Sequence, residues 1–441
     1  MLTRICLCLA LLVAMPAWSQ VVPSATDSAD ISTDDTYMRT PPPVSGEAYP
    51  TETGSETRSN YLRAGLTVNT AYDDNVLAGS SSKPIRDITY TVGTSFSLDQ
   101  STPRLHETFT YSPGFTLYQH TSALNASDQD VSLRFLYRLS PHTVVNLTDS
   151  FQKTSNVFNQ PYQGVPGSAE SSTVAAVAPF ADHLGNAASA QLSYQFSENS
   201  MVGGGGTSTL VNYRSSAEAS GLSNSNSRGG SAFYNLRLSS TQYIGAAYQY
   251  SIMVADSVND ESDIHMNTVS FFYTLYLENS LSLSLSGGPQ RFDLTQSSLK
   301  APGSWKPTVT ASMGWQRKEF NWAASYSRTV TGNGGLIGAF QSNSGDASVR
   351  WQLARTWTIG STTSYGIQKN LATAIFAANP GGHTVSGSAS VQHTINVRLS
   401  MELGYERLHQ SYSGVAAISN APDSNRESIS ILYHFTRPIG R

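Results

Sequence analysis

Apolar and polar side chains alternate along most of this chain with a period of two residues, as the stretch from Asn396 to Leu408 illustrates. One set in this stretch is apolar and comprises Val397, Leu399, Met401, Leu403 and Tyr405. The other set is small or charged and comprises Arg398, Ser400, Glu402, Gly404 and Glu406. A strand separates two such sets onto opposite faces, whereas a helix scatters them around its axis. The pattern predicts a strand with one face suited to lipid or a core and the other suited to water.

The same alternation recurs along the chain and predicts about 18 strands, each close to the roughly 9 to 11 residues that a tilted membrane-spanning strand needs. The predicted strands are 61–72, 88–99, 104–119, 130–139, 143–153, 187–197, 201–213, 231–240, 242–253, 265–278, 280–292, 306–317, 319–329, 346–354, 356–369, 383–395, 396–410 and 426–435.

The connections between these strands alternate between short turns and longer polar segments. The longer segments are 79–84, 154–186, 214–227, 256–262, 331–342 and 412–423. Outer-membrane barrels place tight turns in the periplasm and longer loops outside. The fold class expected is therefore all-β: a transmembrane antiparallel up-and-down β-barrel with short periplasmic turns and longer extracellular loops. A soluble β-solenoid rich in serine and threonine is the alternative fold.

The two ends of the chain differ from the alternating region. Residues 1–19 have a basic start, a short apolar run and small residues up to Ser19, which predicts a signal peptide. Residues 20–59 are rich in Pro, Ser, Thr and acidic residues, which predicts a disordered periplasmic leader. The barrel is expected over 60–436 and a short tail over 437–441. Both cysteines, Cys6 and Cys8, lie in the signal peptide, so no disulfide is expected.

Composition excludes several classes of protein. The chain has 441 residues, of which 27 are basic and 31 acidic, so it lacks the basic excess of a nucleic-acid-binding protein. After the signal peptide there is no run of about 18 apolar residues, which excludes a helical membrane protein. Only 13% of the residues are charged. Few charges and many small polar residues fit a sheet with one apolar face.

Aromatic residues mark the expected membrane boundary. Four tryptophans share the lipid-facing sets of consecutive strands near short turns: Trp315, Trp322, Trp351 and Trp357. Tryptophan favours the membrane interface, so they predict part of a periplasmic aromatic girdle. The last strand ends on Tyr433 and Phe435, which is similar to the C-terminal signal read by the barrel insertion machinery.

The sequence Tyr72-Asp73-Asp74-Asn75-Val76 resembles the signature near the start of the outer-membrane β-barrel porin-2 family. The resemblance implies a bacterial outer-membrane barrel over Tyr61 to Phe435, with some members linked to exopolysaccharide systems. A looser resemblance, without a shared motif, is to alginate-export barrels. Asp73, Asp74 and Asn75 could hold calcium, but calcium takes 6 to 8 ligands. Capping and turning of the strand end is the favoured interpretation.

A group of inward-facing arginines is the main candidate for function. They are Arg63, Arg138, Arg237, Arg350 and Arg398, each near a periplasmic strand end. Rings of arginine favour anion passage, so this basic collar predicts a pore for anionic sugars or polysaccharide. The equally weighted alternative is that the arginines brace the wall by pairing with Glu402, Glu406, Asp99 and turn carboxylates.

Other features point away from catalysis. The nine histidines are dispersed, and no metal-binding spacing or nucleophile motif occurs, so no enzyme activity, metal or cofactor is expected. Gly203 to Gly206 is interpreted as a bend or close-packing site, because no helix follows it. The long loop from Thr154 to Asn186 contains an apolar stretch, Val174 to Phe180, and could fold into the lumen and narrow it.

The resulting functional hypothesis is a passive outer-membrane porin or conduit, for sugars or anionic exopolysaccharide within an export system. The alternatives are a non-conducting surface barrel for adhesion or structure, and a barrel-embedded hydrolase. The expected partners are the lipid bilayer, the insertion machinery and polysaccharide export components, with no nucleic acid.

Overall fold

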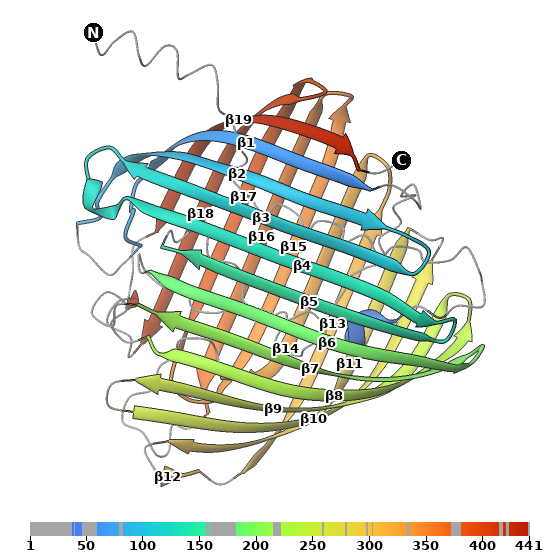
Figure 1. Cartoon of the computed structure of the whole chain (residues 1–441). Helices are drawn as coiled ribbons and strands as arrows, with labels where there is room; N and C mark the ends of the chain where they lie inside the picture. Colours follow the sequence, from blue (N-terminus) through green and yellow to red (C-terminus); the bar gives the residue numbers. More distant parts are fainter. Residues whose placement is uncertain are drawn as a thin grey trace, which may run out of the picture.

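The chain forms one closed antiparallel β-barrel of 18 strands (Figure 1). The computed structural model describes Met38, 40–45, 60–78, 83–155, Phe158, 182–214, 222–257, 260–277, 280–296, 299–301, 303–332, 336–371, 381–413, 418–419 and 423–439. Each strand pairs with its neighbours in the chain, and β1 pairs with β19 to close the ring. The closed ring confirms the barrel and excludes a solenoid.

The first half of the wall comprises β1 (Tyr61–Asp73), β2 (Asp87–Ser101), β3 (Leu105–Tyr118), β4 (Ala126–Ser140), β5 (Thr143–Thr154), β6 (His183–Ser197), β7 (Ser200–Tyr213), β8 (Asn224–Ser239) and β9 (Gln242–Ser257). The second half comprises β10 (Asp260–Leu277), β11 (Leu281–Gln296), β13 (Ser304–Gln316), β14 (Phe320–Thr331), β15 (Phe340–Ala354), β16 (Trp357–Asn370), β17 (Gly381–Asn396), β18 (Leu399–Ser413) and β19 (Ser424–Pro438). β12 (Leu299–Lys300) extends the end of β11 and is not a spanning strand. Two short helical turns, α2 (Pro42–Ser45) and η2 (Ser122–Leu124), complete the described elements.

The predicted strands match the observed ones in order, but at the end with the longer loops several begin too late or end too early. β8 starts at Asn224 instead of 231, and β15 starts at Phe340 instead of 346. Residues 256–262 were expected to be a long loop, yet β9 and β10 extend through most of that range. These extensions carry polar residues on both faces, so they lack the alternation that lipid imposes. β19 also continues to Pro438, past the predicted boundary at 436.

The stretch from Asn396 to Leu408 contains a turn that alternation did not reveal. The Asn396 side-chain oxygen accepts hydrogen bonds from the backbone N–H groups of Arg398, at 2.8 Å, and Leu399, at 3.0 Å. Val397 and Arg398 form this turn, and Val397 is 95% exposed. Asparagine readily bonds its own backbone in turns. The placement of Arg398 on the inner face of a strand was therefore wrong.

The two faces of the wall have opposite chemistry. Apolar side chains are exposed on the outside, including Val92, Leu192, Leu285 and Ile429. Polar side chains on the inner face are buried, including Thr67, Asn69, Ser284 and Gln368. This inversion of the usual soluble pattern is the arrangement of a membrane-spanning barrel. Among the described residues, no helix is long and apolar enough to cross a membrane.

A pair of prolines alters the wall where β11, β13 and β14 meet. Pro289 on β11 lies opposite Pro307 on β13. Pairing between β13 and β14 ends at Val309 and Arg328, and continuing that register would place Pro307, which has no N–H, opposite Val330. The Gln290 side chain bonds Val330 instead: its oxygen accepts the Val330 N–H at 2.7 Å and its amide donates to the Val330 carbonyl at 3.0 Å.

Replacing Gln290 with leucine should destabilise the barrel by about 2–3 kcal/mol, because it leaves a buried N–H and a buried carbonyl of Val330 unbonded. Urea unfolding in detergent measures this change. Gln392→Leu is the matched control, because in the described part of the chain the Gln392 amide donates to a side-chain hydroxyl, that of Ser400, and not to a backbone group. Equal effects of the two variants would contradict the role given to Gln290.

Candidate functional site

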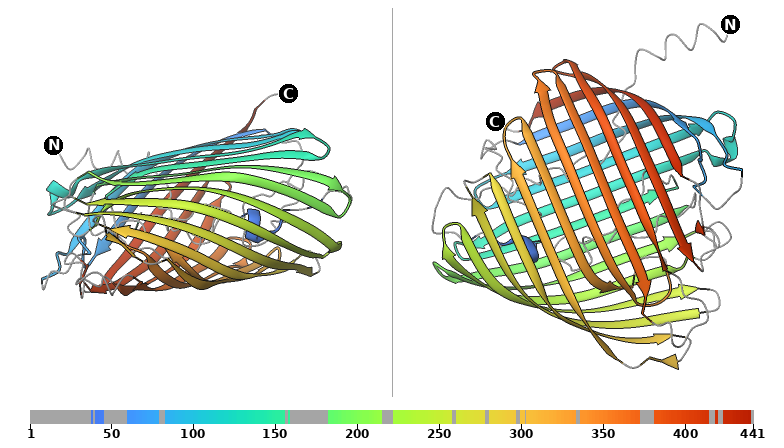
Figure 2. Two further views of the ribbon diagram at one scale, coloured as in Figure 1. Left: turned by 90° about the horizontal axis from the view of Figure 1, so that it is seen from below. Right: turned by 180° about the vertical axis from the view of Figure 1, so that it is seen from behind.

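Part of the N-terminal segment lies inside the barrel, close to the end with the short turns. Met38 and Val44 are buried, and they pack with five side chains that point inward from β7 to β10. These side chains are Met201, Phe233, Tyr243, Phe272 and Tyr276. The helical turn α2 is visible within the barrel outline (Figure 2). We call the described residues 38 and 40–45 the lumen segment, and the five side chains the lumen shelf.

The lumen shelf exists because two glycines on the inner wall leave room for aromatic rings. A Cβ added at Gly203 would lie 2.4 Å from the Phe233 ring, and one added at Gly245 would lie 2.2 Å from the Phe272 ring. The rings can therefore lie close against the backbone and present an apolar surface to the lumen. Gly203 in the sequence Gly203 to Gly206 thus serves close packing.

Two hydrogen bonds fix the lumen segment on this surface. The Met38 N–H donates to the Gln195 side-chain oxygen at 3.0 Å, and the Gln191 amide donates to the Val44 carbonyl at 3.1 Å. The expectation of a solvated leader is therefore wrong for residues 38 and 40–45. Consecutive prolines lose little entropy on ordering and carry no N–H that needs a partner, which favours this placement.

A second apolar cluster crosses the extracellular mouth of the barrel. Leu222, two residues before β8, packs together with Leu336, Phe340, Tyr412 and Ile418. β8 and β18, which carries Tyr412, lie on opposite sides of the ring in the strand order. We call this cluster the mouth bridge. Connections that leave the wall on opposite sides therefore meet over the lumen.

The long loop after β5 also contributes a side chain to the inner face, through Phe158. Phe158 packs against Leu408 and Ala78, and the Arg426 guanidinium lies 5.7 Å from its ring centre. Arg426 is buried and lies 3.9 Å from the Glu406 carboxylate. The apolar stretch Val174 to Phe180, predicted to narrow the lumen, lies outside the described residues.

The predicted arginine collar has several different environments. Arg63 lies 3.6 Å from the Asp99 carboxylate, and the Arg237 guanidinium donates to the Asn199 side-chain oxygen at 3.1 Å. Arg138 and Arg350 occupy inward positions near the ends of β4 and β15. Arg398 lies in the turn before β18. The contact between Arg63 and Asp99 fits the alternative in which arginines brace the barrel wall. Arg350, in contrast, is exposed to solvent.

Acidic side chains occupy the inner face farther from the short turns. Asp73, Asp130 and Asp346 lie on inward positions of β1, β4 and β15, with Glu406 on β18. Glu402, three residues from the turn end of β18, is as close to the short turns as Arg350. The Ser325 hydroxyl donates to Asp346 at 3.0 Å. Arg426 and Lys306 are cations at similar heights. The wall is therefore more basic toward the short turns and more acidic toward the loops.

The motif Tyr72 to Asn75 joins the two ends of the barrel wall. The Asp73 carboxylate accepts the Asn75 N–H at 3.0 Å, which turns the chain at the end of β1. The two Asp74 carboxylate oxygens accept the backbone N–H and the side-chain amide of Asn425, both at 2.7 Å. Tyr72 points outward. These bonds agree with capping. In the described part of the chain, no cluster of side chains is suited to a metal ion.

The aromatic residues singled out in the sequence occupy outward positions. Trp315 pairs with Trp322 across β13 and β14, while Trp351 and Trp357 flank the turn between β15 and β16. Tyr433 and Phe435 face outward from β19. The sequence analysis missed Trp305, which is 62% exposed at the opposite end of β13. Trp305 lies ten residues before Trp315 on the same strand, and this spacing would have indicated an aromatic residue at the other membrane boundary.

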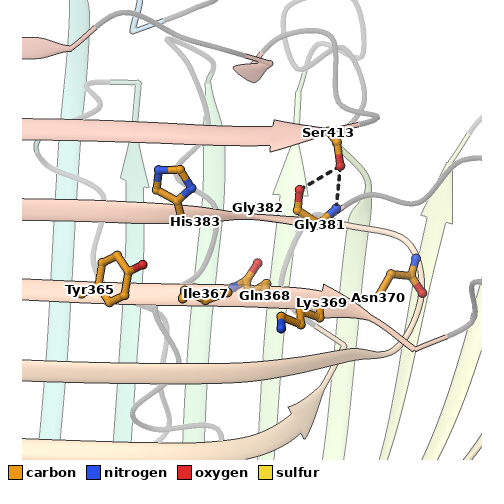
Figure 3. A pocket seen from close by; sticks show the side chains of 9 residues that line it. All are labelled: Tyr365, Ile367, Gln368, Lys369, Asn370, Gly381, Gly382, His383 and Ser413. Atoms are coloured by element: carbon orange, nitrogen blue, oxygen red, sulfur yellow. Dashed lines mark hydrogen bonds between the residues drawn. The ribbon is translucent and has the colours of Figure 1, made fainter.

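A pocket of about 460 Å³ opens where β16, β17 and β18 reach the loop end of the barrel (Figure 3). Its outward-facing lining includes Tyr365, Lys369, His383 and Ser413. Gly381 forms its rim, donating to the Ser413 hydroxyl at 3.3 Å and accepting from it at 3.0 Å. This pocket is separate from the lumen shelf and was not predicted from the sequence.

No protein-family model and no curated protein matches the chain. Among solved structures, OccAB4 of Acinetobacter baumannii is 8% identical with a TM-score of 0.40, covering 87% of this chain and 100% of that one. The outer membrane protein OpdK of Pseudomonas aeruginosa is 10% identical with a TM-score of 0.38, covering 85% and 99%. The siderophore receptor PirA of the same species is 12% identical with a TM-score of 0.40, covering 85% and 80%. Similarity of this degree does not assign a substrate to the chain.

Proposed function

We propose that this protein is a passive conduit across a bacterial outer membrane. The observation that carries the proposal is the inverted wall, with apolar side chains outside and charged side chains such as Arg63 and Arg350 exposed inside. A charged inner wall is costly unless water fills part of the lumen. A signal peptide over residues 1–19 and the insertion machinery would deliver the barrel to that membrane.

For the solute, we propose anionic sugars or an anionic exopolysaccharide, with polysaccharide export components as partners. Support comes from the basic side chains near the short turns and from the resemblance of Tyr72 to Val76 to the porin-2 family. Solutes moving outward would meet the basic region first. Arginine there would attract carboxylate or phosphate groups by charge and by hydrogen bonding.

Replacing Arg63 and Arg350 with glutamine should shift the channel toward cation selectivity, because Asp99 then loses its partner and the wall loses two cations. Reversal potentials across bilayers in a salt gradient measure the shift. Arg317→Gln is the control, because Arg317 lies outside β13 in a turn, over the Trp315 ring. A wild-type channel that already prefers cations would contradict the anionic substrate.

A second candidate function is a non-conducting surface barrel, and the mouth bridge favours it. Five apolar side chains meeting across the mouth leave less room for a solute. Absence of current steps from wild-type protein and from variants that disrupt the mouth bridge, such as Leu336→Asp, would support this candidate over a conduit.

A further inference from the structure

The outward pocket at the ends of β16, β17 and β18 lies at the upper edge of the lipid-facing belt. Tyr365 and Lys369 follow Trp357, at the short turn, by eight and twelve residues along β16. With a rise of about 3.3 Å per residue and a tilt of about 40°, they lie roughly 20 and 30 Å above that turn. The apolar belt of such barrels is about 25 Å tall. The pocket therefore spans the boundary between acyl chains and headgroups.

Basic side chains are frequent on this sector of the outer face. Lys369 is exposed and has no carboxylate partner among the described residues. His383, on β17, packs against His409 of β18 with ring centres 5.3 Å apart and the rings tilted by 36°. Arg407 and His409 share one carboxylate, that of Asp423, with the histidine contact at 2.7 Å. Arg328 adds a further cation on β14.

The corresponding level on β10 and β11, about a third of the way around the ring, is different. Arg291 on β11 lies 3.4 Å from the Asp293 carboxylate, and His265 on β10 lies 3.2 Å from that of Asp263. The cations there already have acidic partners within the chain. The basic side chains beside the pocket thus have fewer acidic partners than those at the same level of β10 and β11.

We propose that this pocket binds the phosphorylated sugar headgroup of an outer-leaflet glycolipid. Lys369 contacts the phosphate, and the exposed Tyr365 ring supports the sugar at the belt edge. The Ser413 hydroxyl, which donates its proton to the Gly381 carbonyl, accepts from a sugar hydroxyl, and His383 bonds a sugar oxygen. The proposal rests on the membrane orientation given under the proposed function, and it does not require that the barrel conducts.

Binding of a purified, phosphorylated bacterial glycolipid to the detergent-solubilised full-length protein tests this site, by native mass spectrometry across a concentration series. Lys369→Gln should weaken binding by about fivefold or more, and the dephosphorylated glycolipid should bind wild-type protein correspondingly weakly. Arg291→Gln, on β11 and away from the pocket, is the matched control and should leave binding unchanged. Heat-dependent migration in electrophoresis verifies that each variant is a folded barrel.

Each alternative result overturns the proposal in a distinct way. Equal loss in the Lys369 and Arg291 variants, or no dependence on the phosphate, would show that the pocket is not a phosphate site. Full competition by soluble glucosamine phosphate would identify a solute site in place of a lipid site. Conductance of the same preparations tests the proposed conduit separately from the lipid site. Lys369→Gln should weaken glycolipid binding and leave the current unchanged.

Discussion

Deleting residues 38–45 should raise single-channel conductance by about twofold or more, because conduction depends on the free cross-section and on the groups lining the lumen. The lumen segment occupies the region beside Phe233, Tyr243 and Phe272, near the short turns. Its removal also exposes the Gln191 and Gln195 amides to water. Planar-bilayer recordings of the full-length chain and the deletion measure the change.

Two further variants separate the lumen segment from a general effect of shortening the leader. Deleting residues 24–31 removes the same length of chain and should leave conductance at the wild-type value. Val44→Asp places a carboxylate against the apolar lumen shelf, and burying an unpaired charge there is costly. This variant should therefore resemble the deletion. If Val44→Asp conducts as wild type does, the segment does not limit the current.

Leu403→Arg should destabilise the folded barrel by about 2–4 kcal/mol, the cost of an arginine on the lipid face near the bilayer midplane. Leu403 is 47% exposed on the outer face of β18 and lies four residues above the turn. Leu399→Arg, at the first residue of the same strand, should cost less than about 1 kcal/mol, because charge is tolerated near the interface. Equilibrium unfolding from phospholipid vesicles measures both free energies.

Glu402→Gln is the inner-face control, and it should alter ion selectivity with little change in unfolding free energy. Glu402 alternates with Met401 and Leu403, so it occupies the lumen-facing set of β18. Similar destabilisation by the Leu399 and Leu403 variants would show that the strand crosses the membrane at a different depth. A large destabilisation by Glu402→Gln would show that the faces are assigned the wrong way round.

The sequence predicted the spanning strands because lipid on one face and water on the other impose a two-residue period. That constraint ends at the headgroups, so it did not reveal that β8 begins at Asn224 or that β10 begins at Asp260. The alternation of apolar and polar residues also continues through the turn at Val397 and Arg398, where Asn396 reverses the chain. A side-chain hydrogen bond of this kind has no signature in the alternation.

The candidate sites were less accessible to sequence reasoning because they depend on contacts between distant strands. The arginines could be assigned to the inner face, but the Asp99 partner of Arg63 depends on strand register. The polar, proline-rich composition of residues 20–59 predicts a solvated tail, which does not hold for the lumen segment. Its two buried apolar residues, Met38 and Val44, have a surface to cover only after β7 to β10 are assembled.

The bonds between Asp74 and Asn425 have a consequence for the lifetime of the folded barrel. These residues are 351 positions apart, and they connect strands that meet only when the ring closes. Contacts of such long range form late, so they contribute little to the transition state for folding. Interactions absent from that transition state chiefly slow unfolding. Asp74 should thus act on how long a closed barrel persists rather than on how fast it assembles.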